Sequence, residues 1–153
     1  MNKAGKAFEE LVKIMDELRE KCPWDREQTF ESIRNLTIEE TYELTDAILE
    51  KDFQNVKKEL GDLLLHIVFY SKIASESNLF NITDVIDQLS KKLIYRHPHI
   101  FGTEQVATAS EVLENWEQIK MSEKGGNKTV LSGVPKSLSA LIKANRIQEK
   151  VRA

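Results

Sequence analysis

Apolar residues recur every three or four positions along almost the whole chain, and this spacing restricts the fold to helices. The first example is the stripe of Phe8, Leu11, Val12, Met15 and Leu18, which is typical of an amphipathic helix. Only three prolines and six glycines interrupt the 153 residues, and no alternating pattern is long enough to indicate a convincing strand. We therefore expect an all-α bundle.

Capping residues divide the first half of the chain into three expected helices. The first ends before Pro23, because the residue before a proline disfavours helical geometry, and residues 22–28 are expected to form a loop. Thr37 and Glu40 have the spacing of a capping box, so a second helix is expected to begin at Thr37. Asp52 is expected to cap the third helix. Gly61 in the middle of that helix indicates close packing at this position.

The apolar stripes predict which face of each helix is buried. The second helix is expected to bury Ile38, Tyr42, Thr45 and Leu49, and the third to bury Val56, Leu60, Leu63, Leu64, Ile67 and Ala74. Three further helices are expected: from Thr83 to near Pro98, from Ser110 to Gly125-Gly126, and from Ser137 onward.

Charge and cysteine content exclude several classes of protein. The chain has 22 basic and 25 acidic residues, a net charge of −3, and a dedicated nucleic-acid-binding protein is usually basic. A single cysteine, Cys22, excludes an internal disulfide and a secreted disulfide scaffold. The apolar runs are far shorter than the ~20 residues of a membrane span, and no apolar signal core follows the first residues. We expect a soluble cytoplasmic protein with neither a nucleic acid nor a membrane as partner.

Four acidic residues are arranged symmetrically around residue 51. Glu43 and Glu59 lie equally far from that residue, and so do Glu40 and Asp62. If the chain folds back there as an antiparallel hairpin, Glu43 comes level with Glu59 and Glu40 with Asp62. Any one of these acids is more often an ordinary solvated side chain, but the mirrored set favours a common site.

Four carboxylates held together repel one another, so we expect a cation between them and a raised pKa for at least one of them. Hard oxygen ligands suit Mg²⁺, Mn²⁺ or Ca²⁺. A di-iron carboxylate bundle would need two Glu-x-x-His elements. His66 instead follows Asp62 by four residues and no second copy exists, so iron is disfavoured.

Basic and aromatic residues later in the chain are candidates for binding phosphate and base. Lys92 and Arg96 share a helix face and suit phosphate, although a solvated basic surface explains them equally well. Trp116 could stack on a nucleobase, but its spacing with neighbouring apolar residues favours core packing. No glycine-rich phosphate loop is present.

The motif Glu39-Glu40-Thr41-Tyr42-Glu43, followed by Glu59-Leu60-Gly61-Asp62, resembles the EExxE…ExxD signature of the MazG family of nucleoside triphosphate pyrophosphohydrolases. The similarity extends to Cys22-Pro23-Trp24-Asp25, to Lys92-Leu93 with Arg96-His97-Pro98, and to Trp116-Glu117. It covers about residues 8–122. The resemblance implies an all-α fold and a homodimer or larger homo-oligomer. It also implies Mg²⁺, with Mn²⁺ as a substitute, and hydrolysis of nucleoside triphosphates to monophosphate and pyrophosphate.

The resemblance also assigns roles by motif position. Glu40, Glu43, Glu59 and Asp62 would hold the metal, and Lys92, Arg96 and Trp116 would contact the nucleotide. Bound metal would neutralise the phosphates and activate a water for attack at the α-phosphorus. Glu39, which is not needed as a ligand, is the candidate catalytic residue that orients this water.

Two departures from the family pattern bear on domains and activity. Many members have two basic residues where this chain has Tyr95-Arg96, which implies a weaker phosphate grip. Two-domain members continue past a segment similar to Val134-Pro135-Lys136 into a second signature-bearing domain. We expect a MazG-like catalytic helical domain over residues 1–124, and a loop and C-terminal helix over residues 125–153. This last part is interpreted as a truncated linker to a missing second domain, or as a frayed tail.

Two alternative functions remain at this point. One is a non-catalytic helical dimerisation or regulatory module in which the acids bind a structural metal. The other is a house-cleaning dNTPase restricted to altered bases.

Overall fold

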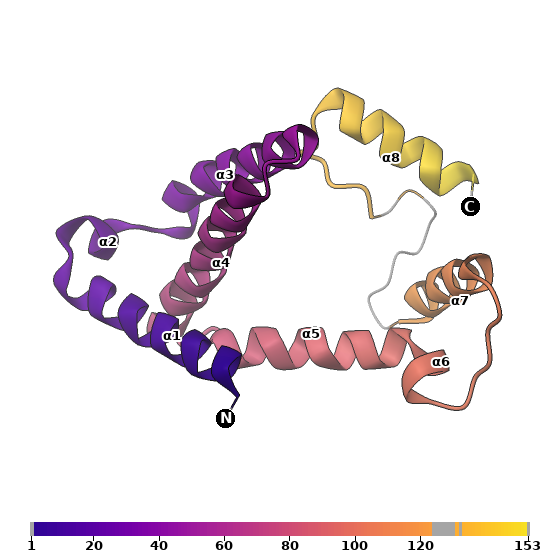
Figure 1. Ribbon diagram of the computed structural model, residues 1–153, viewed down its shortest axis with the longest axis horizontal. Coiled ribbons are helices and arrows are strands. Elements are labelled where there is room, and N and C mark those ends of the chain that lie inside the picture. The colour runs from indigo at the N-terminus through magenta and orange to yellow at the C-terminus, as the bar shows by residue number, and fades with distance from the viewer. Residues whose placement is uncertain (1, 124–130, 132, 153) are drawn as a thin grey trace. The chain divides into compact units, whose positions relative to one another are not determined.

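The computed structural model describes residues 2–123, 131 and 133–152, and within these residues the chain is helical with no strand (Figure 1). The expected all-α fold is confirmed. The helices are α1 (Lys3–Lys21), α2 (Pro23–Glu27), α3 (Phe30–Glu50), α4 (Phe53–Glu76), α5 (Ile82–Arg96), α6 (Pro98–Phe101), α7 (Ala109–Ser122) and α8 (Ala140–Arg152). No helix in this part of the chain is both long and apolar enough to cross a membrane.

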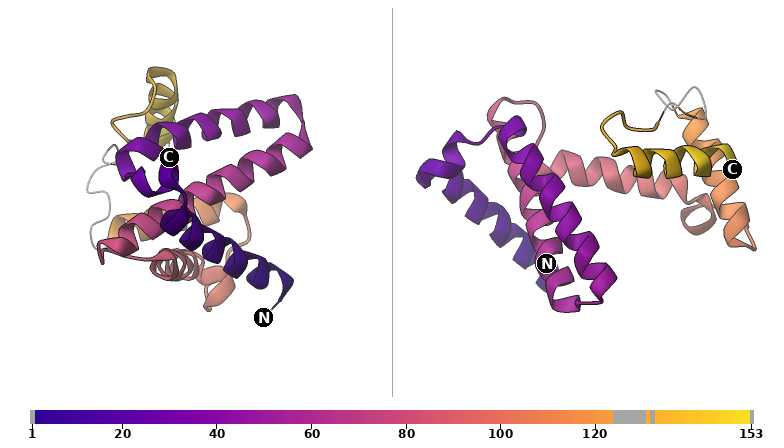
Figure 2. Two further views of the ribbon diagram at one scale, coloured as in Figure 1. Left: turned by 90° about the vertical axis from the view of Figure 1, so that its left-hand side faces the viewer. Right: turned by 90° about the horizontal axis from the view of Figure 1, so that it is seen from above.

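The chain forms two compact units, Met1–Asp87 and Gln88–Ala153, and each is described by itself. In the first unit α3 and α4 form an antiparallel hairpin, and α1 packs against α4 (Figures 1 and 2). The core of this unit consists of Met15, Ile33, Val68 and Phe69, all of them buried. Burial of each such side chain contributes about 1.5–3 kcal/mol, so α1, α3 and α4 hold one another in place.

The hairpin turns where the sequence predicts. Lys51 adopts the left-handed conformation, with φ of 59°, and its N–H donates to the last turn of α3. The side chain of Asp52 then accepts hydrogen bonds from the backbone N–H groups of Gln54 and Asn55, each at 3.1 Å. The prediction of Asp52 as the N-cap of the second arm is confirmed, and the two residues together reverse the chain within one turn.

The predicted start of α3 at Thr37 is wrong, because the helix begins seven residues earlier. Thr29 is the N-cap, and its hydroxyl accepts from the N–H of Ser32 while the Ser32 hydroxyl accepts from the N–H of Thr29. No proline or glycine separates Phe30 from Thr37, so nothing stops the helix from starting at this earlier capping box. The Thr37 hydroxyl instead donates to the carbonyl of Ile33.

Other predicted boundaries shift in smaller ways. Residues 22–28 do not form a simple loop, because Pro23 opens the short helix α2, a position that proline favours. Asn81 caps the start of α5 at Ile82, where Thr83 was expected, and Thr108 caps α7. The helix expected to begin at Ser137 begins at Ala140. Gly125-Gly126 and the predicted domain boundary beside residue 124 lie outside the described residues.

For the single chain, the predicted inner face of α3 is wrong, whereas that of α4 is partly confirmed, because Ala74 is buried and Val56 and Leu63 are half-buried. Ile38, Tyr42 and Leu49 on α3 are 51%, 53% and 74% exposed, and Leu60 and Ile67 on α4 are also about half exposed. We call the exposed set Ile38, Tyr42, Leu49, Leu60, Leu64 and Ile67 the apolar face of the hairpin. The close packing expected at Gly61 is likewise absent within the described chain, because a Cβ there would meet nothing within 4 Å.

Candidate functional site

The hairpin brings acidic residues from both arms together. Glu40 and Glu43 on α3 and Glu59 on α4 each offer a carboxylate oxygen, and these oxygens all lie within 4.8 Å of one another. Asp62 lies one helical turn after Glu59, and the Nζ of Lys58 lies near the carboxylates of both. We call Glu40, Glu43, Glu59 and Asp62 the acidic cluster. The mirrored spacing therefore produces the expected convergence, while the role of each acid as a ligand stays a prediction.

Glu59 is the buried centre of this cluster. Its side chain is 1% exposed, and its Oε1 accepts a hydrogen bond of 2.9 Å from the Nζ of Lys58. Its Oε2 is buried and has no hydrogen-bond partner within the described residues. An unpaired buried acceptor costs about 1–3 kcal/mol, and more when it carries charge. The unpaired oxygen lies among other carboxylates, an arrangement that a cation ligated there would relieve.

Electrostatic repulsion within the cluster is visible at Glu40. Burial raises the pKa of Glu40, and the charges of Glu43, Asp62 and Glu59 raise it further. The expectation of a raised pKa in this set is confirmed for Glu40. A cation bound in the cluster would favour the charged form of this carboxyl and so offset the shift.

Lys58 is a member of the site that the sequence analysis missed. Its Nζ lies 2.9 Å from Oε1 of Glu59, 3.6 Å from Oδ2 of Asp62 and 3.9 Å from Oε2 of Glu43. The spacing of Lys58 and Asp62, four residues apart on one helix, was the available signal. Lys58 therefore places one positive charge beside three of the four carboxylates, while the metal ion expected among the acids stays a prediction.

His66 lies one turn beyond Asp62 and is 8% exposed. Burial lowers its pKa, and the nearby charge of Asp62 only partly opposes this effect, so the ring is neutral at pH 7. Its Nδ1 has no hydrogen-bond partner in the described part of the chain. A single histidine of this kind does not supply the paired Glu-x-x-His elements of a di-iron site.

The remaining predicted residues fall outside the acidic cluster. Glu39 is exposed, and because successive helical residues point about 100° apart, it leaves α3 in a different direction from Glu40. Lys92, Arg96 and Trp116 belong to the second unit. There Nε and Nη2 of Arg96 donate to both carboxylate oxygens of Glu123, at 2.8 and 2.6 Å.

Trp116 is half-buried, and two cationic side chains lie near its ring. The guanidinium carbon of Arg96 lies 5.6 Å from its ring centroid, and the Nζ of Lys120 lies 4.5 Å away. Its Nε1 is buried with no hydrogen-bond partner among the described residues. The structure thus brings Arg96 and Trp116 together, and Lys92 is an exposed residue one turn before Arg96.

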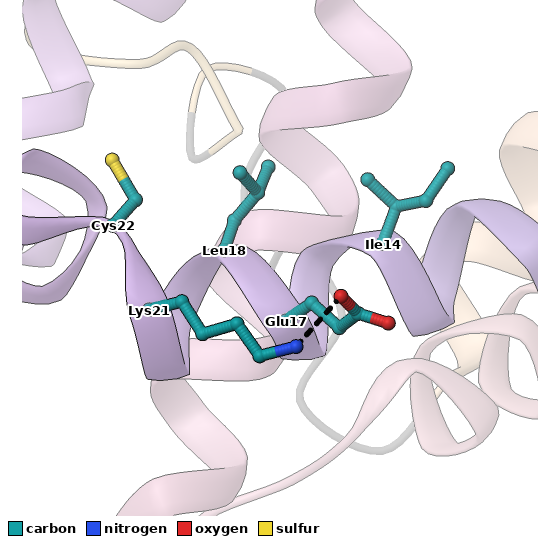
Figure 3. A pocket seen from close by; sticks show the side chains of 5 residues that line it. All are labelled: Ile14, Glu17, Leu18, Lys21 and Cys22. Carbon is teal, nitrogen blue, oxygen red and sulfur yellow. Dashed lines mark hydrogen bonds and ion pairs between the residues drawn. The ribbon is translucent and has the colours of Figure 1, made fainter.

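A hollow on α1 carries none of the predicted site residues (Figure 3). It measures about 390 Å³ and is lined by Ile14, Glu17, Leu18, Lys21 and Cys22. All five side chains come from one stretch of α1 and its C-cap, and Glu17 and Lys21 form an ordinary helical ion pair across 2.9 Å. We assign no function to this groove along a single helix.

Residues 28–101 match the MazG nucleotide pyrophosphohydrolase domain. This part of the chain is a MazG domain. It includes both arms of the acidic hairpin, and it also includes Lys92 and Arg96, whereas Trp116 lies beyond it.

Two curated relatives extend the similarity over nearly the whole chain. The nucleoside triphosphate pyrophosphohydrolase of Escherichia coli strain K12 is 44% identical over 148 residues, which cover 94% of this chain and 56% of that protein. The nucleoside triphosphate pyrophosphohydrolase/pyrophosphatase MazG of Thermotoga maritima is 49% identical over 152 residues, covering 97% and 58%. The chain with its MazG domain thus spans a little over half the length of these relatives.

A solved structure shares the fold. The crystal structure of a mazG-related protein from Thermotoga maritima aligns with a TM-score of 0.65 and 24% sequence identity, covering 74% of this chain and 99% of that one. The chain therefore shares its helical fold with a solved structure.

Proposed function

We propose that this chain hydrolyses nucleoside triphosphates to nucleoside monophosphate and pyrophosphate, with Mg²⁺ held by the acidic cluster. The observation that carries the proposal is Glu59, a fully buried carboxylate with an unpaired oxygen among acids from both arms of the hairpin. The names of the two curated relatives support the choice of reaction.

The donor set of the cluster fits a hard divalent cation. It offers only carboxylate oxygens, which suit Mg²⁺, and Mn²⁺ would substitute. When bound, such an ion neutralises phosphate charge and lowers the pKa of a coordinated water. Glu40, Glu43, Glu59 and Asp62 would hold it. Glu39, exposed next to Glu40, would orient the attacking water.

Lys92, Arg96 and Trp116 would bind the nucleotide. Arg96 already presents a two-pronged set of donors to the Glu123 carboxylate, and the same fork fits a phosphate group. Binding a phosphate through Nε and Nη2 would therefore require Arg96 to exchange Glu123 for the substrate. Trp116 offers an aromatic face for the base, shared with the cations that lie against it.

The active form is proposed to be a homodimer or larger assembly in the cytoplasm. The apolar face of the hairpin is exposed in the single chain although its spacing is that of a buried stripe. A second copy packed on this face would bury it and supply the second helical layer that a bundle needs. Sedimentation of an active protein as a concentration-independent monomer would contradict this assembly.

The test is a product analysis. The purified protein is incubated with each NTP and dNTP plus Mg²⁺, and the products are separated by chromatography. We expect monophosphate and pyrophosphate, and loss of turnover in Glu59→Gln but not in Asp46→Asn, an exposed acid of α3 outside the cluster. Diphosphate and orthophosphate as primary products would overturn the proposal.

Two further outcomes of the same test would favour the alternatives. Nucleotide binding without any turnover would indicate a non-catalytic module with a structural metal. Turnover confined to dNTPs with altered bases would indicate a house-cleaning enzyme.

A further inference from the structure

The contacts of Lys58 differ from those of every other lysine for which ion pairs are recorded in the described chain. Its Nζ lies within 4 Å of three carboxylates from both arms of the hairpin, whereas Lys13, Lys21, Lys72 and Lys120 each pair with one. These three carboxylates, on Glu43, Glu59 and Asp62, are the proposed ligands of the divalent cation. The ammonium and a bound cation would compete for the same oxygens.

We propose that Lys58 is an exchangeable counterion of the acidic cluster, which neutralises the carboxylates until a divalent cation takes its place. The proposal rests on the proposed function, because it assigns Lys58 a role toward the metal site.

The geometry favours a lysine that can leave. The Lys58 side chain is 61% exposed, while Glu59, its nearest partner, is 1% exposed. Lysine carries a compact charge on a flexible four-carbon stem, so its ammonium can move into solvent without disturbing the core. Glu59 cannot move away in the same manner, because it is buried between the helices. The exchange therefore moves the lysine and leaves the ligands in place.

The position of the Lys58 ammonium should affect the affinity of the cluster for metal, because both charges offset the same repulsion. With Lys58 in place, one positive charge offsets part of the repulsion among the acids. A divalent cation supplies twice that charge at the same position, and the ammonium must then retreat from it. Lys58 therefore stabilises the metal-free protein and weakens metal binding, and removing it should have the two opposite effects.

Lys57 provides a matched control. It precedes Lys58 on α4 and is exposed, but its Nζ hydrogen-bonds to Oε1 of Gln54 at 3.1 Å and is in no recorded ion pair with the cluster. Lys57→Gln and Lys58→Gln remove the same charge from adjacent positions. Lys58→Arg keeps the charge and tests whether a change of shape alone has an effect.

The experiment measures binding of Mn²⁺ alone by calorimetry, and melting temperatures in chelator, for the full chain and the three variants. Lys58→Gln should bind Mn²⁺ about fivefold more tightly than the parent, the factor that corresponds to about 1 kcal/mol for an exposed ion pair. It should also melt at a lower temperature in chelator. Lys57→Gln and Lys58→Arg should stay close to the parent in both measurements.

The outcomes separate this proposal from the proposed function. Equal Mn²⁺ affinity in Lys58→Gln and Lys57→Gln, with the parent binding normally, would overturn the counterion role and leave the metal site standing. Weaker binding in Lys58→Gln would also overturn it. A parent that binds no Mn²⁺ would overturn both proposals.

Discussion

Replacing Glu59 with glutamine should raise stability without metal and abolish the stabilisation that metal gives. The substitution preserves the shape of a side chain that is 1% exposed and removes one charge from the crowded cluster. The amide oxygen can still accept from Lys58, and the amide NH₂ can donate to the carboxylate of Glu40 or Glu43. The buried oxygen that now lacks a partner is thereby replaced by a donor among acceptors.

The size of the effect follows from these two changes. Giving the unpaired buried oxygen a partner should stabilise the metal-free protein by about 1–3 kcal/mol. Weakening the contact with exposed Lys58 should destabilise it by at most about 1 kcal/mol. A net gain of about 1 kcal/mol raises the melting temperature of a chain of this length by about 2–4 °C. Mg²⁺ at 100 times its Kd should stabilise the parent by about 2.7 kcal/mol and the variant far less.

The assay is thermal unfolding of the parent, Glu59→Gln and the control Asp46→Asn, each in chelator and in Mg²⁺. The order of melting temperatures should reverse: the variant melts above the parent in chelator and below it in Mg²⁺. The control should follow the parent within about 0.5 kcal/mol under both conditions, as is usual for a surface substitution. Equal Mg²⁺ shifts in parent and Glu59→Gln would refute the assignment of Glu59 as a ligand.

Three other substitutions test separate parts of the structure. Arg19 lowers the pKa of Glu76 through a hydrogen-bonded ion pair, so Glu76→Gln should cost about 1 kcal/mol at pH 7 after allowance for the exposure of Glu76. This difference should shrink as the pH falls below 4.5, and acid unfolding curves that stay parallel would contradict it. Ile38→Glu should weaken self-association at least a hundredfold in sedimentation, because both copies in a two-fold interface would contribute the buried charge. Leu141→Glu, an exposed position on α8, should leave self-association unchanged. Gly61→Ala should raise the free energy of unfolding by about 0.5–1 kcal/mol in denaturant titrations, because alanine favours the helix and its Cβ would meet nothing within 4 Å. A lower free energy of unfolding would show that something covers Gly61.

The position of the turn and the convergence of acids from both arms could be predicted from sequence because they depend on few quantities. Asp52 identifies the start of the second arm, because its side chain caps α4. Residues equally far from residue 51 along the two helices then come level with each other. The false capping box at Thr37 did not affect this result, since moving the start of α3 leaves the spacing from Glu40 to residue 51 unchanged. Thr29 and Thr37 are both possible N-caps, and the hydrogen bonds formed between Thr29 and Ser32 decide for Thr29.

The buried faces could be predicted only in part. The first half of α4 buries a charged residue and exposes apolar ones, whereas farther along the helix Val68, Phe69 and Ala74 are buried. Glu59 and His66 lie seven residues apart on its buried side, while Leu60 and Ile67, at the same separation, are about half exposed. Apolar periodicity identifies a stripe that some surface must cover, but it does not say whether the same chain provides that surface. In this hairpin the burial of Glu59 is accompanied by exposure of Leu60 and Leu64, while Leu63 and Leu65 are half-buried. The burial of Glu59 and the exposure of the apolar face are therefore two consequences of one rotation of α4, and both should change together in any variant that turns this helix.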